Sequence, residues 1–223
     1  MSSLNKLKKK FKGLVPEEII EKKIRELGPE DAEKFFDKEL ERHNMNTWVF
    51  LKYAIPSFES YACSMAANIR GEKRSKEDLE NAIKHVTKGE PLEKPIEKLF
   101  PFAVNTLRAL AMGKPVTDKK IREYFLIYHR GIVEENPVHK TEEDLINDIA
   151  WPAVVKEVKD KIAKVETPIG EMEVKLDLLP DAKVGDKISV HYGYACERVP
   201  ESIWKKAFEH HKKLGRPKKR RPF

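Results

Sequence analysis

The sequence predicts an α+β protein, in which an all-α N-terminal domain is followed by a small β-barrel and a C-terminal helix. Through the first two-thirds of the chain, apolar residues recur at spacings of three and four, and no period of 20 to 50 residues repeats. After Pro152 the apolar period changes to two, and after Pro200 a helical pattern returns. We therefore expect a helical domain at 1–146, a barrel with its closing helix at 147–211 and a basic tail at 212–223.

Proline, glycine and capping residues divide the N-terminal part into six or seven predicted helices. One helix is expected between Pro16 and Gly28, because proline suits a first turn and glycine ends helices. Ser75 followed by Asp78 resembles a capping box with the shorter acid, which predicts another helix start. A later apolar helix is expected to bend or break at Pro101.

The last of these helices is expected to begin after Thr117. Ile121, Tyr124, Phe125 and Tyr128 follow at spacings i, i+3, i+4 and i+7, which places all four on one face of an α-helix. We expect this face to be buried.

Four short strands are predicted in the C-terminal third. Residues 153–158 and 162–167 read as a hairpin, residues 171–178 alternate strictly between charged and apolar, and 188–192 resume the alternation. Four half-apolar strands in about fifty residues make a poor open sheet but a reasonable small barrel. A helix after Pro200 is expected to cover one end of it.

The net charge of +7 comes from the two ends of the chain. Without the twelve basic residues in these ends, 32 basic residues face 37 acidic ones, a net charge of −5. This argues against a nucleic-acid-binding face built into the fold, but leaves two cationic arms that could meet phosphate or an acidic partner. The N-terminal arm carries Lys6, Lys8, Lys9, Lys10 and Lys12.

The C-terminal arm supports the alternative of nucleic-acid association. "LGRPKKRRPF" is similar to the core of an AT-hook, a segment that lies in a narrow minor groove, although Leu214 replaces its first arginine. A small barrel with cationic arms would fit such a role, above all if the barrel is of the OB-like type that the family resemblance described next implies. A disordered, solubilising tail is the equally weighted alternative. The basic residues are Lys212, Lys213, Arg216, Lys218, Lys219, Arg220 and Arg221.

Four pieces of sequence follow one another over roughly residues 147–210: the proline of "NDIAWP", the "AKV" strand, "VKLDLLPDAKVGD" and "VHYGYA". In this order and spacing they resemble the HupF/HypC family of hydrogenase-maturation chaperones. The resemblance implies an OB-like β-barrel with a C-terminal helix, and a non-enzymatic chaperone or adaptor. The partner would be a maturation factor or a client precursor, bound through the barrel. His191, Tyr194 and Asp148 are the partner-binding residues that the resemblance suggests.

Asp148 stands where the family has a cysteine, and Ala153 replaces the glycine after the family's proline. A carboxylate is not a soft ligand for low-spin iron, so we expect the fold and the binding surface without the thiolate chemistry. The alternative for His191 is an ordinary histidine on the outer face of a strand, because Val190 and Tyr192 are expected to face the core.

The remaining candidate residues give no support to a catalytic, metal or cofactor site. Cys63 and Cys196 are expected to be packed as small hydrophobes. His210 and His211 diverge on a helix, and the other four histidines before residue 140 are scattered. No phosphate-binding loop, G-x-S-x-G or H-E-x-x-H occurs. We therefore expect no enzyme activity, metal or cofactor.

A cytoplasmic location is expected, without membrane association. No apolar run approaches the length of about 20 residues that a membrane span needs, and the start of the sequence is charged rather than apolar. Two cysteines far apart in the sequence are typical of a protein with reduced thiols.

Overall fold

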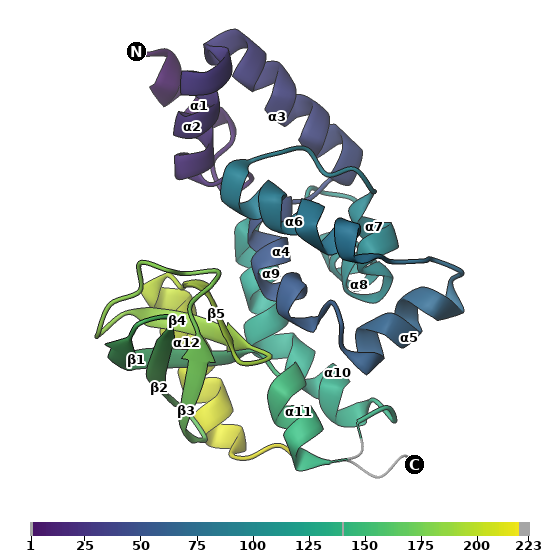
Figure 1. The fold of residues 1–223 in the computed structure, drawn as a ribbon, viewed down its shortest axis with the longest axis vertical. Coiled ribbons are helices and arrows are strands. Elements are labelled where there is room, and N and C mark those ends of the chain that lie inside the picture. Colours follow the sequence, from purple (N-terminus) through teal and green to yellow (C-terminus); the bar gives the residue numbers. More distant parts are fainter. Residues whose placement is uncertain (1, 140, 219–223) are drawn as a thin grey trace. The chain divides into compact units, whose positions relative to one another are not determined.

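The computed structural model describes residues 2–139 and 141–218, and it confirms the predicted α+β class. The chain divides into two compact units, one formed by Met1–Phe58 and Cys63–Ile121, the other by Glu59–Ala62 and Arg122–Phe223. Helices make up the first unit, and a barrel with helices makes up the second (Figure 1). The predicted boundary between residues 146 and 147 stays a prediction about which part folds by itself.

The helices before the barrel begin and end largely where the sequence indicates. The Ser75–Asp78 capping box is present, α8 begins at Pro101 and α2 ends at Gly28. Eleven α-helices precede the barrel in the described residues, and the first ten are already more than predicted, because several are very short. They are α1 (Ser3–Lys10), α2 (Glu17–Leu27), α3 (Pro29–His43), α4 (Thr47–Ala54), α5 (Tyr61–Ile69), α6 (Lys76–Lys88), α7 (Ile96–Leu99), α8 (Pro101–Ala111), α9 (Asp118–Glu123) and α10 (His129–Glu135). The short helix α11 (Glu142–Asp148) then leads into the barrel.

The predicted N-terminal cationic arm is instead the helix α1, packed in the first unit. Phe11, which follows it, packs edge-to-face on Phe36, with the ring centroids 5.3 Å apart. The ammonium of Lys8 lies 2.6 Å from the carboxylate of Glu21, and that of Lys10 lies 2.7 Å from Asp37. The expectation of a free arm was wrong because apolar residues interleaved with the lysines give the segment a buried face.

A π-helical turn, η2 (Tyr124–Tyr128), interrupts the helix predicted after Thr117. The backbone amide of His129 donates to the carbonyl of Tyr124, five residues back, instead of to the carbonyl four residues back. Tyr124 and Phe125 are buried as predicted, but Tyr128 is 54% exposed. The extra residue in the turn shifts the inward position from Tyr128 to His129.

The barrel is closed and has five strands rather than four, in the order β1-β2-β3-β5-β4. The strands are β1 (Trp151–Lys159), β2 (Ile162–Thr167), β3 (Gly170–Lys175), β4 (Lys187–His191) and β5 (Tyr194–Arg198). Neighbours pair antiparallel except β3 and β5, which are parallel and meet at Lys175 and Tyr194. Five strands in this arrangement form the OB-like barrel that was expected.

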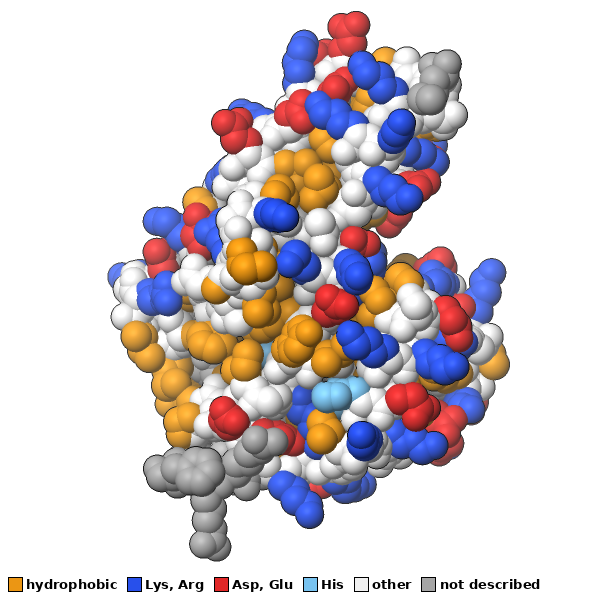
Figure 2. Space-filling model, turned by 180° about the vertical axis from the view of Figure 1, so that it is seen from behind, with side chains coloured by type: hydrophobic (Ala, Val, Ile, Leu, Met, Phe, Trp, Pro, Cys, Tyr) orange, Lys and Arg blue, Asp and Glu red, His pale blue; other side chains and the backbone are white. Residues whose placement is uncertain are grey.

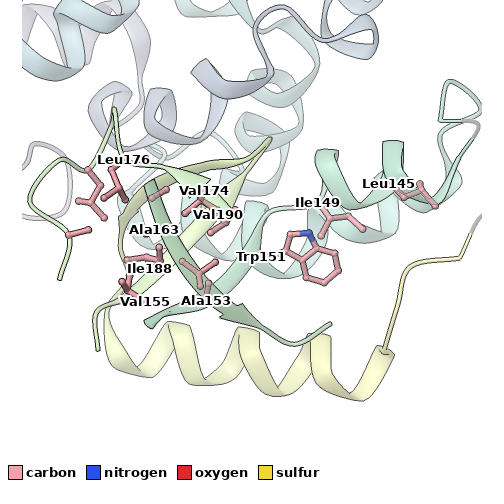
Figure 3. Close-up of a cluster of buried hydrophobic side chains, with 14 of the residues drawn as sticks. Leu145, Ile149, Trp151, Ala153, Val155, Ala163, Val174, Leu176, Ile188 and Val190 are labelled. Atoms are coloured by element: carbon pink, nitrogen blue, oxygen red, sulfur yellow. The ribbon is translucent and has the colours of Figure 1, made fainter. Parts of the chain in front are cut away.

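Along β3, the apolar side chains face the core and the charged ones face solvent, as the sequence predicts. Val174 and Leu176 are buried, whereas Glu171 and Glu173 are exposed. The core inside the barrel continues beyond it, because Leu145 of α11 joins the same cluster (Figure 3). The barrel and α11 therefore share one hydrophobic core, which makes α11 part of the fold that positions the strands.

The helix α12 (Glu201–Leu214) packs along β1. The indole nitrogen of Trp204 donates to the carbonyl of Ala153 at 2.9 Å, and Ala207 is fully buried. Gly215 ends the helix as predicted. None of the helices in 2–139 and 141–218 is long and apolar enough to cross a membrane.

A buried ion pair ties the end of α9 to β5 within the second unit. Both nitrogens Nε and Nη2 of Arg122 donate to the carboxylate of Glu197, at 2.7 and 2.8 Å. The side chains are only 12% and 6% exposed. Removing one partner of such a pair leaves a buried charge, so the loss of either side chain would cost more than the intact pair adds in net stability.

Acid is expected to destabilise the second unit through His211 of α12. His211 Nε2 donates to the carbonyl of Leu126 at 2.9 Å, and Nδ1 lies 3.4 Å from the Arg130 guanidinium, which can only donate. Burial, with charge from Arg130 and His210, lowers the pKa of His211 to about 3. Because the folded pKa lies below the unfolded value of about 6.5, this stabilisation is complete above pH 6.5 and is lost as the pH falls toward 3.

His211→Gln keeps a neutral donor and acceptor, so its free energy of unfolding is expected to fall less between pH 7 and pH 4 than that of the wild type. The difference is on the order of 2–3 kcal/mol. Urea unfolding at both pH values measures it, with His210→Gln as the neighbouring control. An equal fall in wild type and His211→Gln would refute the assignment.

Candidate functional site

The structure brings two of the three suggested partner-binding residues together. Asp148 is the last residue of α11, and His191 is the last residue of β4. The carboxylate oxygen Oδ1 of Asp148 lies 3.6 Å from Nε2 of His191. Tyr194 begins β5 and pairs with His191 across the hairpin, but its side chain is partly exposed and packs under the ammonium of Lys175.

His191 faces away from the barrel core, as its place between core-facing positions suggests, but it is not on a free surface. Val190 belongs to the barrel core, so the next side chain points outward. Helical residues cover this outer face: the ring of His191 lies 6.0 Å from that of Phe125 and 5.8 Å from that of His129, centroid to centroid. His191 is therefore 1% exposed, a burial that the sequence did not predict.

Backbone hydrogen bonds join the end of α11 to the turn between β4 and β5. The amide of Tyr192 donates to the carbonyl of Asn147 at 3.0 Å, and Nε2 of His191 lies 3.0 Å from the carbonyl oxygen of Asp148. These carbonyls are among those that a helix leaves unsatisfied at its C-terminal end. The contacts fix Asp148 and His191 relative to each other.

Asp148 is a negative charge at the end of a helix where the helix dipole disfavours it. Burial alone would raise the pKa of its carboxyl, but hydrogen bonds from His139 and His191 and the nearby His129 hold this pKa well below its usual range. Nε2 of His139 lies 2.8 Å from the other oxygen, Oδ2. The group is therefore an ionised carboxylate with imidazoles on both sides.

His129 completes the cluster from the start of α10. One ligand atom each of His129, Asp148 and His191 lies within 4.8 Å of the others, a spacing that could hold a metal ion. Burial lowers the pKa of His129 to about 4, so its ring is neutral and keeps a free lone pair at neutral pH. Its Nδ1 is buried and has no hydrogen-bond partner within the part of the chain that is described.

Sequence reasoning missed His129 and His139 because neither has a motif. They lie 19 and 9 residues before Asp148, and 62 and 52 residues before His191, so no ligand spacing is visible. The π-turn that points His129 inward leaves no clear sequence signal either. The resemblance alone singled out Asp148 and His191.

The two cysteines differ in burial. Cys196 is fully buried, which confirms the expected packing as a small hydrophobe. Cys63 is only partly buried, and the guanidinium of Arg74 donates to its sulfur at 3.0 Å, so its surroundings are more polar than predicted.

The basic residues of the alternative interface divide into three groups. Lys212 and Lys213 lie in the last turn of α12, where they face the negative end of the helix dipole. Arg216 pairs with Glu142 at 3.0 Å, and Lys218 follows it. Three further residues lie outside the described part: Lys219, Arg220 and Arg221. On the face in Figure 2, basic and acidic side chains are interspersed.

The comparisons with known proteins agree with the suspected resemblance. Residues 149–210 match the model of the HupF/HypC family, and this segment holds the complete barrel, His191 and most of α12. Of the cluster, only His191 lies inside the match; His129, His139 and Asp148 precede it. The search of curated proteins gave no match.

The turn that carries His191 provides a test of this geometry. Tyr192 and Gly193 both have positive φ, +47° and +72°, as a two-residue type I′ hairpin requires. No atom would touch a Cβ at Gly193 or at Gly131 of α10, so alanine at either position changes only the backbone preference.

Gly193→Ala is expected to destabilise the protein by about 1–2 kcal/mol, because an L-residue is strained at positive φ. Gly131→Ala is expected to stabilise it by about 0.5–1 kcal/mol, because Gly131 lies inside a helix. Urea unfolding of both variants measures these opposite signs. A stabilising effect at Gly193 would show that the turn is built differently.

Proposed function

We propose that the chain is a non-enzymatic chaperone or adaptor, related to the hydrogenase-maturation chaperones of the HupF/HypC family, and that it binds a protein partner through its barrel. The observation that carries this proposal is the family match over residues 149–210, which coincides with a complete closed barrel and its covering helix.

The three suggested partner-binding residues differ in burial, so we propose different functions for them. His191 is 1% exposed, so it cannot contact a partner directly and would act by holding the β4–β5 turn. Asp148 would hold the same turn from α11. Tyr194 is partly exposed beside Lys175, at the one place where β3 meets β5. Tyrosine combines a large apolar ring with a polar tip, which suits the centre of a protein interface.

Tyr194→Ala is therefore expected to weaken partner binding by about tenfold or more, the loss typical of an interface hot spot. The measurement is the amount of partner recovered with tagged full-length chain from its native host, followed by a titration with the purified partner. Tyr128→Ala is the matched control, because Tyr128 is 54% exposed and lies outside the family match.

The proposal requires that a maturation factor or a hydrogenase precursor is recovered with the wild-type chain. Recovery of neither protein would contradict the proposed function. Recovery with equal affinity for wild type and Tyr194→Ala would leave the role standing and remove Tyr194 from the interface.

Nucleic-acid association stays the alternative, carried by the cations after α12. It predicts binding that falls steeply with salt and is lost when residues 216–223 are removed, a truncation that keeps α12 and Gly215 intact. Binding to nucleic acid that resists 200 mM salt, or no binding at low salt, would speak against this alternative.

A further inference from the structure

We propose that His129, Asp148 and His191 form a binding site for a divalent transition-metal ion of the zinc or ferrous-iron type. This inference does not rest on the proposed docking role, because it concerns the buried joint between α10, α11 and β4 and not the outer surface of the barrel.

The donor set matches the chemistry of such ions. Two imidazoles and one carboxylate are the protein ligands of many zinc and ferrous-iron sites, which keep further positions for water or substrate. Zinc binds nitrogen and oxygen at about 2.0–2.2 Å, so two donors in its tetrahedral shell lie about 3.3–3.6 Å apart. The donor atoms here lie within 4.8 Å of one another, so the widest pair would close by up to about 1.5 Å when the ion binds.

The cluster also has one feature that a merely structural role leaves unexplained. The buried Nδ1 of His129 has no hydrogen-bond partner among the described residues, which is costly for a group that water would otherwise satisfy. Asp148, whose carboxylate already contacts His139 and His191, lies beside it. A bound cation would use an imidazole lone pair and offset the buried negative charge.

A second layer of side chains holds the carboxylate. Nε2 of His139 lies 2.8 Å from Oδ2 of Asp148, while Oδ1 is the oxygen closer to His191. Outer partners of this kind orient metal ligands and raise their affinity. Phe125 adds an apolar wall, with its ring 5.5 Å from that of His129 and 6.0 Å from that of His191. His139 is thus assigned as a positioning residue.

The site differs from the cysteine-dependent iron chemistry that the family resemblance implies. An aspartate stands in place of the thiolate, and His129 and His139 come from a segment that the family match does not cover. Carboxylate and imidazole are harder donors than thiolate, so they suit exchangeable divalent ions rather than low-spin iron. In the proposed site, the ligands other than His191 therefore come from residues before the segment that matches the family.

The test uses the full-length chain without an affinity tag, stripped with a chelator. Zinc is titrated against a chromophoric chelator, and one Zn²⁺ per chain is expected. His139→Gln should weaken binding about 10–100-fold, the effect of losing an outer partner, and His129→Gln should weaken it further. His210→Gln, on α12 and outside the cluster, should bind as the wild type does. Circular dichroism establishes that each variant is folded.

The absorption spectrum of the Co²⁺-substituted wild type gives a result that needs no variant. Visible ligand-field bands without a thiolate-to-cobalt charge-transfer band are expected from nitrogen and oxygen donors. The proposal is overturned if the wild type binds no Zn²⁺, if folded His129→Gln binds with unchanged affinity, or if the cobalt spectrum shows a thiolate ligand.

Discussion

A carboxylate buried at the C-terminal end of a helix is the constraint on which the second unit depends. Asp148 is ionised and nearly enclosed, so it needs partners that a helix end cannot supply by itself. His191 of β4 and His139 of the loop before α11 provide them. Since the adjacent Asn147 carbonyl accepts from the amide of Tyr192, satisfying this one helix end also sets the position of the β4–β5 turn. Two sets of contacts therefore hold α11 against β4. One is the polar joint between Asp148 and His191, and the other is the shared apolar core, which includes Leu145 and Val190.

The contacts between Asp148 and His191 join the residue just before the segment that matches the HupF/HypC model to a strand within it. The segment that matches the HupF/HypC model keeps its closed sheet and its histidine, while the residues just before it bring a carboxylate and two further imidazoles. A histidine that the barrel alone would leave outward-facing becomes a buried group with charged neighbours. In the proposed metal site, Asp148 would supply a harder donor than the sulfur expected at that position from the resemblance, and the site would form because α10 and α11 pack against that face of the barrel.

The sequence predicts the parts of this structure that depend on local pattern. The strict alternation through Glu171 and Leu176 predicted a barrel strand, and Ser75 and Asp78 predicted a helix start. The fifth strand was missed because Tyr192 before Gly193 is not a usual pair for a type I′ turn, so the last predicted strand was 188–192 and no hairpin was expected after it. The inward turn of His129 depends on a π-turn that helical spacing does not reveal, and the burial of His191 depends on helices about sixty residues earlier in the chain. The site forms through packing between segments that are distant in the sequence. The resemblance therefore identified Asp148 and His191 but not His129 and His139.

The coupling between Asp148 and His191 in the free energy of unfolding tests this account most directly. Asp148→Asn, His191→Gln and the double variant form a cycle, measured by urea unfolding in the presence of a chelator and followed through the indole NMR signals of Trp151 and Trp204 in the second unit. If the two side chains form one joint, the losses are non-additive by about 0.5–3 kcal/mol, as for residues in direct contact. Losses that simply add would show that the carboxylate and the histidine act independently, and the joint would not be what holds the site.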